Sequence, residues 1–251
     1  MLRALVVRRL TQEWSPRQIA TTLARTYPDR PELRVSHETI YQALYVQSRG
    51  ALRRELTRCL RTGRAVRRPQ RRQDERQPRF RGMLMISQRP AEVADRAVPG
   101  HWEGDLILGA NTTSAIGTLV ERATRFCLLL HLPDGHTPEQ VAAAMITQMG
   151  RLPTHLRRTL TWDQGMEMGR HAHISMALDM PIYFCDPHSP WQRGSNENTN
   201  GLLRQYFPKG TDLSVHSAAD LDYVATKLNG RPRQTLGWQT PLQRMNQLLL
   251  Q

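Results

Sequence analysis

The segment after residue 99 most strongly restricts the possible folds, because short apolar runs alternate there with turn and helix-capping residues. Three runs, over 102–108, 115–120 and 126–132, have the length of strands and are separated by turn-forming residues. Two more strands are expected over 159–162 and 182–185. The first three strands form a meander, and the later strands alternate with helices. This order, βββαβαβα, predicts an α/β fold in which helices cover a mixed sheet.

Helices are indicated by capping residues and by apolar side chains at helical spacing. Thr137, Pro138 and Gln140 have the pattern of a capping box, and Val141 and Met145 follow on one face. Further helices are expected over 166–179, 195–207, 217–229 and 240–250.

The positive charge of the chain is concentrated in its first third. The protein has 251 residues and a net charge of +13. Residues 1–81 contain 20 arginines and 7 acidic residues, and therefore carry all of this excess. Such an asymmetry predicts a polyanion-binding arm joined to a neutral body. Arginine suits this role because its forked donors match phosphates and guanine edges.

Two short helices are expected in the basic arm. The first begins at Ser15-Pro16, where Gln18 completes a capping box, and the second covers 37–46. Together they predict a helix-turn-helix whose second helix enters a DNA groove. The residues expected to face that groove are His37, Thr39 and Gln42. A helical hairpin that does not bind DNA is the alternative, and the surrounding charge favours DNA.

Composition divides the chain into three parts. We expect a helix-turn-helix DNA-binding region over 1–60, an Arg/Pro-rich linker over 61–98 and the α/β domain over 99–251. The Arg-rich stretch at the start of the linker contains too few apolar residues to bury a core of its own.

Three acidic residues lie where the expected strands and helices end or begin. Asp105 is on the first strand, Asp163 ends the fourth strand, and Glu197 is in the first turn of the helix near Ser195. Sites in α/β sheets gather at strand ends, and a helix N-terminus favours an ionised carboxylate. Three carboxylates that met there would suit Mg²⁺, which prefers oxygen ligands. Ordinary surface charge is the alternative, because residues 82–251 contain 15 acidic residues.

Several long segments resemble the insertion-sequence-30 family of bacterial transposases. They are GHWEGDLI at 100–107, TLVER at 118–122, LTWDQG at 160–165, DPHSPWQRGSNEN at 186–198, NGLLRQYFPKG at 200–210 and LNGRPR at 228–233. In the basic arm, WSP at 14–16 and VSHETIY at 35–41 are similar to the helix-turn-helix region of that family. Members usually carry another helix-turn-helix upstream, so the chain is expected to lack that part.

The resemblance implies a ribonuclease H-like core with a triad of two aspartates and one glutamate. The matching residues are Asp105, Asp163 and Glu197, with 33 residues between the last two. It also implies two Mg²⁺ ions, replaceable by Mn²⁺, which stabilise the attacking and leaving oxygens of a phosphodiester displacement. The implied reaction nicks DNA at terminal inverted repeats and joins the freed 3′-OH to target DNA. A homo-oligomer is expected, because two DNA ends must meet.

Other polar residues surround the expected triad. Asn200 and Arg204 share a helix face with Glu197, and Arg193 precedes that helix, so all three are candidates for binding DNA phosphates. An ordinary polar helix face is the alternative. Glu103 lies two residues from Asp105 on the same strand face, where a salt bridge is favoured over a role as a metal ligand.

Trp162 and Trp191 flank two of the proposed ligands. Core packing is expected for both, and base stacking is the alternative for Trp191.

Two other functions compete with a transposase. The first is a truncated DNA-binding protein that blocks a full-length copy without chemistry, and the second is a general ribonuclease H-like nuclease. The intact triad argues against the first, and the basic arm argues against the second.

The sequence predicts a cytoplasmic, nucleoid-associated bacterial protein with no membrane partner. It contains no run of about 18 apolar residues and no signal-peptide pattern. The three cysteines, Cys59, Cys127 and Cys185, are odd in number, far apart and without a C-x-x-C pattern, which argues against a disulfide framework and a cysteine-type zinc site.

Overall fold

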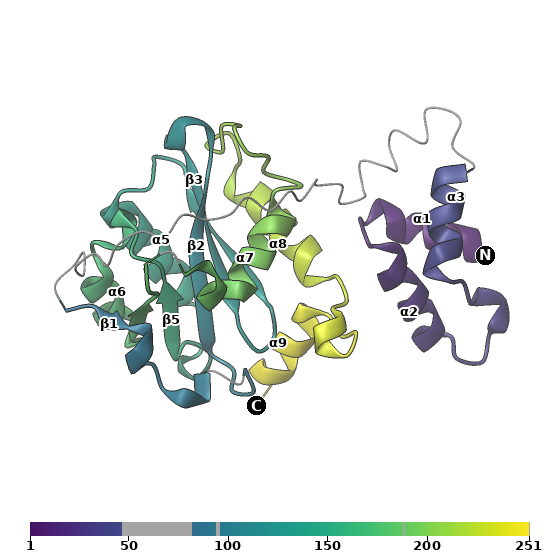
Figure 1. The fold of residues 1–251 in the computed structure, drawn as a ribbon, viewed down its shortest axis with the longest axis horizontal. Coiled ribbons are helices and arrows are strands. Elements are labelled where there is room, and N and C mark those ends of the chain that lie inside the picture. The colour runs from purple at the N-terminus through teal and green to yellow at the C-terminus, as the bar shows by residue number, and fades with distance from the viewer. Residues whose placement is uncertain (47–81, 94–95, 188, 251) are drawn as a thin grey trace. The chain divides into compact units, whose positions relative to one another are not determined.

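The computed structural model describes residues 1–46, 82–93, 96–187 and 189–250. These residues form two compact units. One contains the described N-terminal residues together with Gly230–Thr240, and the other contains the rest of the described chain. Each unit is described on its own (Figure 1). The predicted linker residues 61–81 lie outside the described residues.

The N-terminal unit contains three helices, α1 (Leu2–Thr11), α2 (Pro16–Thr26) and α3 (His37–Val46). Both expected helices are confirmed, and α3 has the predicted bounds. The capping box at Ser15 and Gln18 is also present. The helices enclose a small apolar core that consists of Leu10, Ile19, Leu23, Ile40 and Leu44. Helix α1 was not expected, and it completes the core by contributing Leu10.

The second unit contains a six-stranded sheet in the order β1-β6-β5-β2-β3-β4. Its strands are β1 (Leu84–Met85), β2 (His101–Leu108), β3 (Ala115–Glu121), β4 (Cys127–Leu132), β5 (Thr159–Trp162) and β6 (Ile182–Phe184). Strands β2, β3 and β4 are antiparallel, whereas β2, β5, β6 and β1 are parallel. The predicted meander and the mixed α/β sheet are therefore confirmed.

Strand β1 lies in the segment that the sequence assigns to the linker. Leu84 pairs with Tyr183, and Met85 pairs with Phe184. Two short 3-10 helices follow at Ile86–Gln88 and Ala91–Val93. A strand of two residues has no measurable periodicity, so only its pairing with β6 reveals it.

Helices pack on both faces of the sheet. They are α5 (Pro138–Met149), α6 (His171–Leu178), α7 (Gly194–Leu203), α8 (Ala218–Asn229) and α9 (Pro241–Leu249). Figure 1 shows α5 and α6 to one side of the sheet and α7 and α8 to the other. Side chains alternate along β3, so Leu119 joins the core beneath α5, whereas Ile116 and Val120 join the core beneath α8.

Two predicted helices differ from those in the structure. The expected helix over 166–179 is divided into a 3-10 turn at Met166–Met168 and α6. The expected helix over 195–207 ends at Leu203 and continues as a turn toward Pro208. No helix in the described ranges is long and apolar enough to cross a membrane.

Candidate active site

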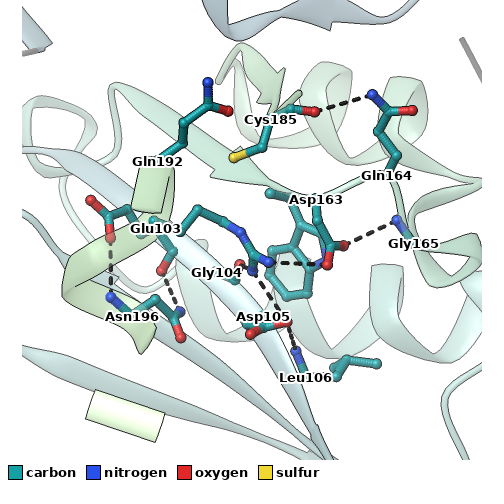
Figure 2. A network of polar contacts seen from close by, with 12 residues as sticks. Glu103, Gly104, Asp105, Leu106, Asp163, Gln164, Gly165, Cys185, Gln192 and Asn196 are labelled. Atoms are coloured by element: carbon teal, nitrogen blue, oxygen red, sulfur yellow. Dashed lines mark hydrogen bonds and ion pairs between the residues drawn. The ribbon is translucent and has the colours of Figure 1, made fainter. Parts of the chain in front are cut away.

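Asp105 lies on β2, and Asp163 directly follows the neighbouring parallel strand β5. Strands β2 and β5 pair Glu103 with Thr161. Asp105 and Asp163 each follow one of these paired residues by two positions, so both side chains lie on the same face of the sheet. Figure 2 shows the two carboxylates close together at this edge of β2 and β5. The structure thus brings together the two aspartates that the sequence selects.

The guanidinium of Arg193 bridges the two carboxylates. Its Nη1 lies 3.1 Å from Asp105 Oδ1, and its Nη2 lies 3.0 Å from Asp163 Oδ2. Nη1 also donates to the Gly104 carbonyl at 2.7 Å. Arg193 was expected to contact DNA, but here it is buried and directed at the aspartates. The two carboxylates therefore converge on one positive group.

Burial and mutual repulsion act on this pair of aspartates. Burial raises the pKa of the Asp105 carboxyl, the charge of Asp163 raises it further, and Arg193 opposes both effects. Burial alone would lower the pKa of Arg193, but the two carboxylates outweigh it and raise that pKa above its ordinary value. The positive charge of Arg193 therefore favours the ionised form of Asp105.

Neighbouring groups orient each aspartate. The Leu106 N–H donates to Asp105 Oδ1 at 2.9 Å, and Asn200 Nδ2 donates to Asp105 Oδ2 at 3.0 Å. The Gly165 N–H donates to Asp163 Oδ1 at 3.0 Å. Asn200 was expected to bind DNA phosphate, and here it orients a carboxylate.

The donor set at this edge fits a hard divalent cation. Two carboxylates converge, and the buried Asn200 Oδ1 accepts no hydrogen bond from the described residues. Oxygen donors of this kind are the ligands that Mg²⁺ prefers.

The third acidic residue, Glu197, lies exposed in the first turn of α7. Within the described ranges, no three His, Cys, Asp or Glu side chains are grouped closely enough to hold a metal ion. The structure therefore pairs Asp105 with Asp163 but does not gather Glu197 with them. The ion pairs of Arg193 join it to Asp105 and Asp163.

Glu103 anchors the helix that carries Glu197. Its carboxylate is fully buried and accepts the Ser195 N–H at 2.8 Å and the Asn196 N–H at 3.0 Å. It also forms an ion pair with Arg122 at 2.9 Å. The salt bridge favoured from the sequence is confirmed. A second role of Glu103 was not expected: its carboxylate accepts hydrogen bonds from backbone amides at the N-terminus of α7 that have no partner within the helix.

Asn196 is a second anchor that the sequence analysis did not select. It is fully buried, and its Nδ2 donates to the carbonyls of Glu103 at 2.9 Å and Thr118 at 3.1 Å. Its Oδ1 accepts the Thr118 hydroxyl at 3.0 Å. Its position inside the motif SNEN, beside Glu197, was the available signal.

Other predicted residues have different surroundings. Arg204 follows α7 directly and donates to the carbonyls of Leu108 at 3.1 Å and Phe207 at 3.3 Å. These hydrogen bonds fix the chain at the C-terminal end of α7. The predicted DNA-reading side chains of α3 are all exposed, namely His37, Thr39 and Gln42.

The two tryptophans also differ from each other. Trp162 is buried, as expected, and donates to Glu167 at 2.9 Å. The expectation that Trp191 packs in the core is wrong, because its side chain is 69% exposed. It lies in the short 3-10 turn Pro190–Arg193.

Two of the cavities lined by described residues of this unit bear on the site. One cavity, of about 520 Å³, lies along β4, α5 and the start of α8. Neither Asp105 nor Asp163 lines it. The other, of about 450 Å³, is bordered by Trp191 and Gln192, next to Arg193. Proximity to the carboxylates makes the second cavity the relevant one.

Comparison with known proteins defines the class of this fold and site. Residues 95–190 match the family model of the integrase core domain. The match contains β2 to β6 and both aspartates and ends before α7. Together with the mixed sheet, it identifies a ribonuclease H-like integrase core, which is the core of a nucleic-acid-processing enzyme.

Similar full-length proteins narrow this class to one family. The chain is 56% identical over 240 residues to the transposase for insertion sequence element IS1086 of Cupriavidus metallidurans, covering 96% of this chain and 70% of that protein. It is 45% identical over 243 residues to transposase InsI for element IS30C of Escherichia coli, covering 96% of this chain and 63% of that protein. The chain belongs to the insertion-sequence-30 family of transposases.

A more distant relative extends over the whole chain. The transposase for element IS4351 of Bacteroides fragilis is 34% identical over 254 residues, covering 100% of this chain and 74% of that protein. The chain thus spans roughly two thirds to three quarters of these relatives, and 63% of the protein from Escherichia coli.

Proposed function

We propose that this protein cuts DNA at the terminal inverted repeats of an insertion sequence and joins the freed 3′-OH ends to target DNA. The observation that carries the proposal is the convergence of Asp105 and Asp163 on one cationic group, within an integrase core. In the first step, water attacks a phosphorus atom and a P–O bond breaks to release a 3′-OH. In the second step, that 3′-OH attacks a target phosphorus and displaces one strand oxygen. Neither step needs an oxidant or a covalent enzyme intermediate.

The proposed metal ligands are Asp105, Asp163 and Glu197. Two Mg²⁺ ions, or Mn²⁺ in their place, would supply charge stabilisation of the attacking and leaving oxygens when bound. Asn200 holds Asp105 in position through its amide. Glu103 holds the N-terminus of α7, and with it the backbone that carries Glu197.

DNA is the proposed substrate and partner. Arg193 points toward the carboxylates, where a scissile phosphate would need positive charge, and Arg204 lies one helical turn beyond Asn200. In the N-terminal unit, the exposed residues of α3 suit contacts to base edges. We propose a homo-oligomer, because strand transfer requires two DNA ends in one complex.

Nicking of supercoiled plasmid tests the proposal directly. The wild-type protein is compared with Asp163→Asn and Glu197→Gln in Mg²⁺ and in Mn²⁺. Glu139→Gln serves as the matched control, because Glu139 is an exposed carboxylate on α5 that pairs with Arg170. We expect nicking by the wild type and the control only, with DNA binding retained by all four proteins.

Two results would contradict this function. DNA binding without nicking by the wild type would indicate a binding protein without chemistry. Faster cleavage of RNA–DNA hybrids than of duplex DNA would indicate a general nuclease.

A further inference from the structure

A cavity of about 450 Å³ lies beside the aspartate pair and combines arginines with an exposed tryptophan. Arg89, Arg96 and Arg122 line it, and Trp191 and Gln192 border it. The cavity is linked to the site in two ways. Gln192 directly precedes Arg193 in the chain, and Arg122 forms an ion pair with Glu103, which lies on the strand of Asp105. Its volume falls in the range of about 300–1,000 Å³ that is usual for small-molecule sites.

The arginines of this cavity repel one another. Burial lowers the pKa of Arg89 and Arg122, and the charge of Arg122 lowers that of Arg89 further. Burial also lowers the pKa of the nearby Arg125, followed by the charge of Arg96. An anion placed among these groups relieves the repulsion.

The acidic groups around the cavity are already engaged. Glu103 pairs with Arg122 and accepts two backbone amides of α7. Asp186, in the cavity wall, accepts from Gln192 Nε2 at 2.8 Å. The cavity wall therefore keeps more positive than negative charge, which suits a phosphodiester.

Trp191 is held in place although it is exposed. Its neighbour Gln192 makes two hydrogen bonds to Asp186, because Gln192 Oε1 also accepts the Asp186 N–H at 2.8 Å. These bonds close the loop in which Trp191 lies. A large aromatic ring that is 69% exposed and close to arginines offers a stacking surface for a base.

We propose that this cavity binds one unpaired nucleotide of the DNA substrate, with its phosphate on the arginines and its base against Trp191. A base inside a duplex presents only its edges, so stacking on a side chain requires a base outside the helix. The assignment rests on the proposed function, since it places a nucleotide next to the scissile phosphate. It adds a binding site that the carboxylates do not provide.

Binding to two DNA probes tests this assignment. Fluorescence anisotropy in EDTA compares a short blunt duplex with the same duplex carrying one unpaired terminal nucleotide. We expect the wild type to bind the duplex with the unpaired nucleotide about tenfold more tightly than the blunt duplex. This is the gain in affinity that one stacked base provides. Trp191→Ala and Arg96→Ala lose that preference and bind the blunt duplex as the wild type does. Trp191→Phe keeps the preference, because it retains an aromatic ring.

Matched controls separate the cavity from general surface effects. Tyr223→Ala removes an aromatic ring on α8 that is 63% exposed, and Arg151→Ala removes an exposed arginine that follows α5. Both keep the wild-type preference if the assignment holds.

Three results would overturn the assignment. Equal binding of both probes by a wild type that nicks plasmid would refute the nucleotide site alone. The nucleotide site is also refuted if Arg96→Ala lowers the affinity for both probes equally, or if Trp191→Ala keeps the preference for the unpaired end. A wild type that binds neither probe would refute the nucleotide site and the proposed function together.

Discussion

The Glu103 carboxylate accepts the backbone N–H of Asn196 at 3.0 Å and thereby joins the strand that carries Asp105 to the helix that carries Glu197. These two residues are far apart in sequence, and both are fully buried. The position of α7 therefore depends on a charged group inside the core.

Replacing Glu103 with alanine should destabilise the second unit strongly. The change leaves Arg122 buried without its carboxylate, and breaking a buried pair in this way costs about 3–5 kcal/mol. It also frees two amides at the start of α7. Urea denaturation measures the free energy of unfolding of each variant. Glu139→Ala, at an exposed ion pair, should cost less than about 1 kcal/mol, so similar losses for the two variants would refute the anchoring role.

Replacing Asn200 with alanine should weaken metal-dependent nicking without reducing DNA affinity. Its amide orients Asp105, and loss of such a supporting group typically costs about 10–100-fold in metal affinity or activity. The Mg²⁺ concentration for half-maximal nicking should therefore rise. A variant with reduced DNA binding and an unchanged Mg²⁺ requirement would instead place Asn200 in the DNA interface.

Replacing Arg193 with glutamine should destabilise the protein in a pH-dependent way. The pKa of Asp105 is raised already, and loss of the guanidinium raises it further. The folded variant then binds protons more readily than the unfolded chain, so its stability falls as the pH rises through the pKa of Asp105. The loss at neutral pH should be about 1–3 kcal/mol, and it should shrink on acidification. Unfolding curves at several pH values measure it, and a pH-independent loss would contradict the bridging geometry.

Replacing Gly104 with alanine should cost stability through overpacking. A Cβ at this position would collide with the ring of Trp162, which packs against the β2 backbone next to both aspartates. Overpacking of this kind costs about 1–3 kcal/mol. Gly194→Ala is the control, since the Cβ it would add meets no atom within 4 Å beyond its chain neighbours and its own helix backbone. Thermal unfolding distinguishes the two, and equal melting temperatures would show that Trp162 moves aside freely.

Cys185 should resist thiol reagents in the native protein. Burial raises the pKa of its thiol to about 12. At pH 8 its thiolate fraction is then about a thousandfold below that of an ordinary cysteine, and alkylation slows accordingly. Peptide mapping by mass spectrometry after timed alkylation measures the rate at this residue. Rapid native labelling, compared with a urea-denatured sample, would contradict the burial.

Local features of the chain were predicted well because local chemistry determines them. The capping box at Ser15 and Gln18 begins α2 as expected, and the strand over 159–162 has the predicted bounds. Strand β1 was not expected because two residues carry no periodicity. Helix α1 was not expected, although several of its apolar residues recur at helical spacing and pack in the core of the N-terminal unit, namely Leu2, Leu5, Val6 and Leu10.

The site was predicted in part. The sequence motifs pointed to Asp105 and Asp163. The register of β2 with β5 brings these two residues side by side. The grouping of Glu197 with these aspartates stays a prediction. Arg193 and Asn200 were selected as DNA contacts, but in this structure both side chains bind the aspartates.

From the sequence alone one could predict strands β2 to β6, most of the helices, the basic character of the N-terminal arm and the family to which the motifs point. These features follow from periodicity, capping and charge, which act over a few residues. Three features became visible only in the folded chain: Arg193 bridges two aspartates, Glu103 anchors α7 and Trp191 is exposed. Such contacts join residues that are 30 to 93 positions apart, so they depend on strand order and register, which no local pattern encodes.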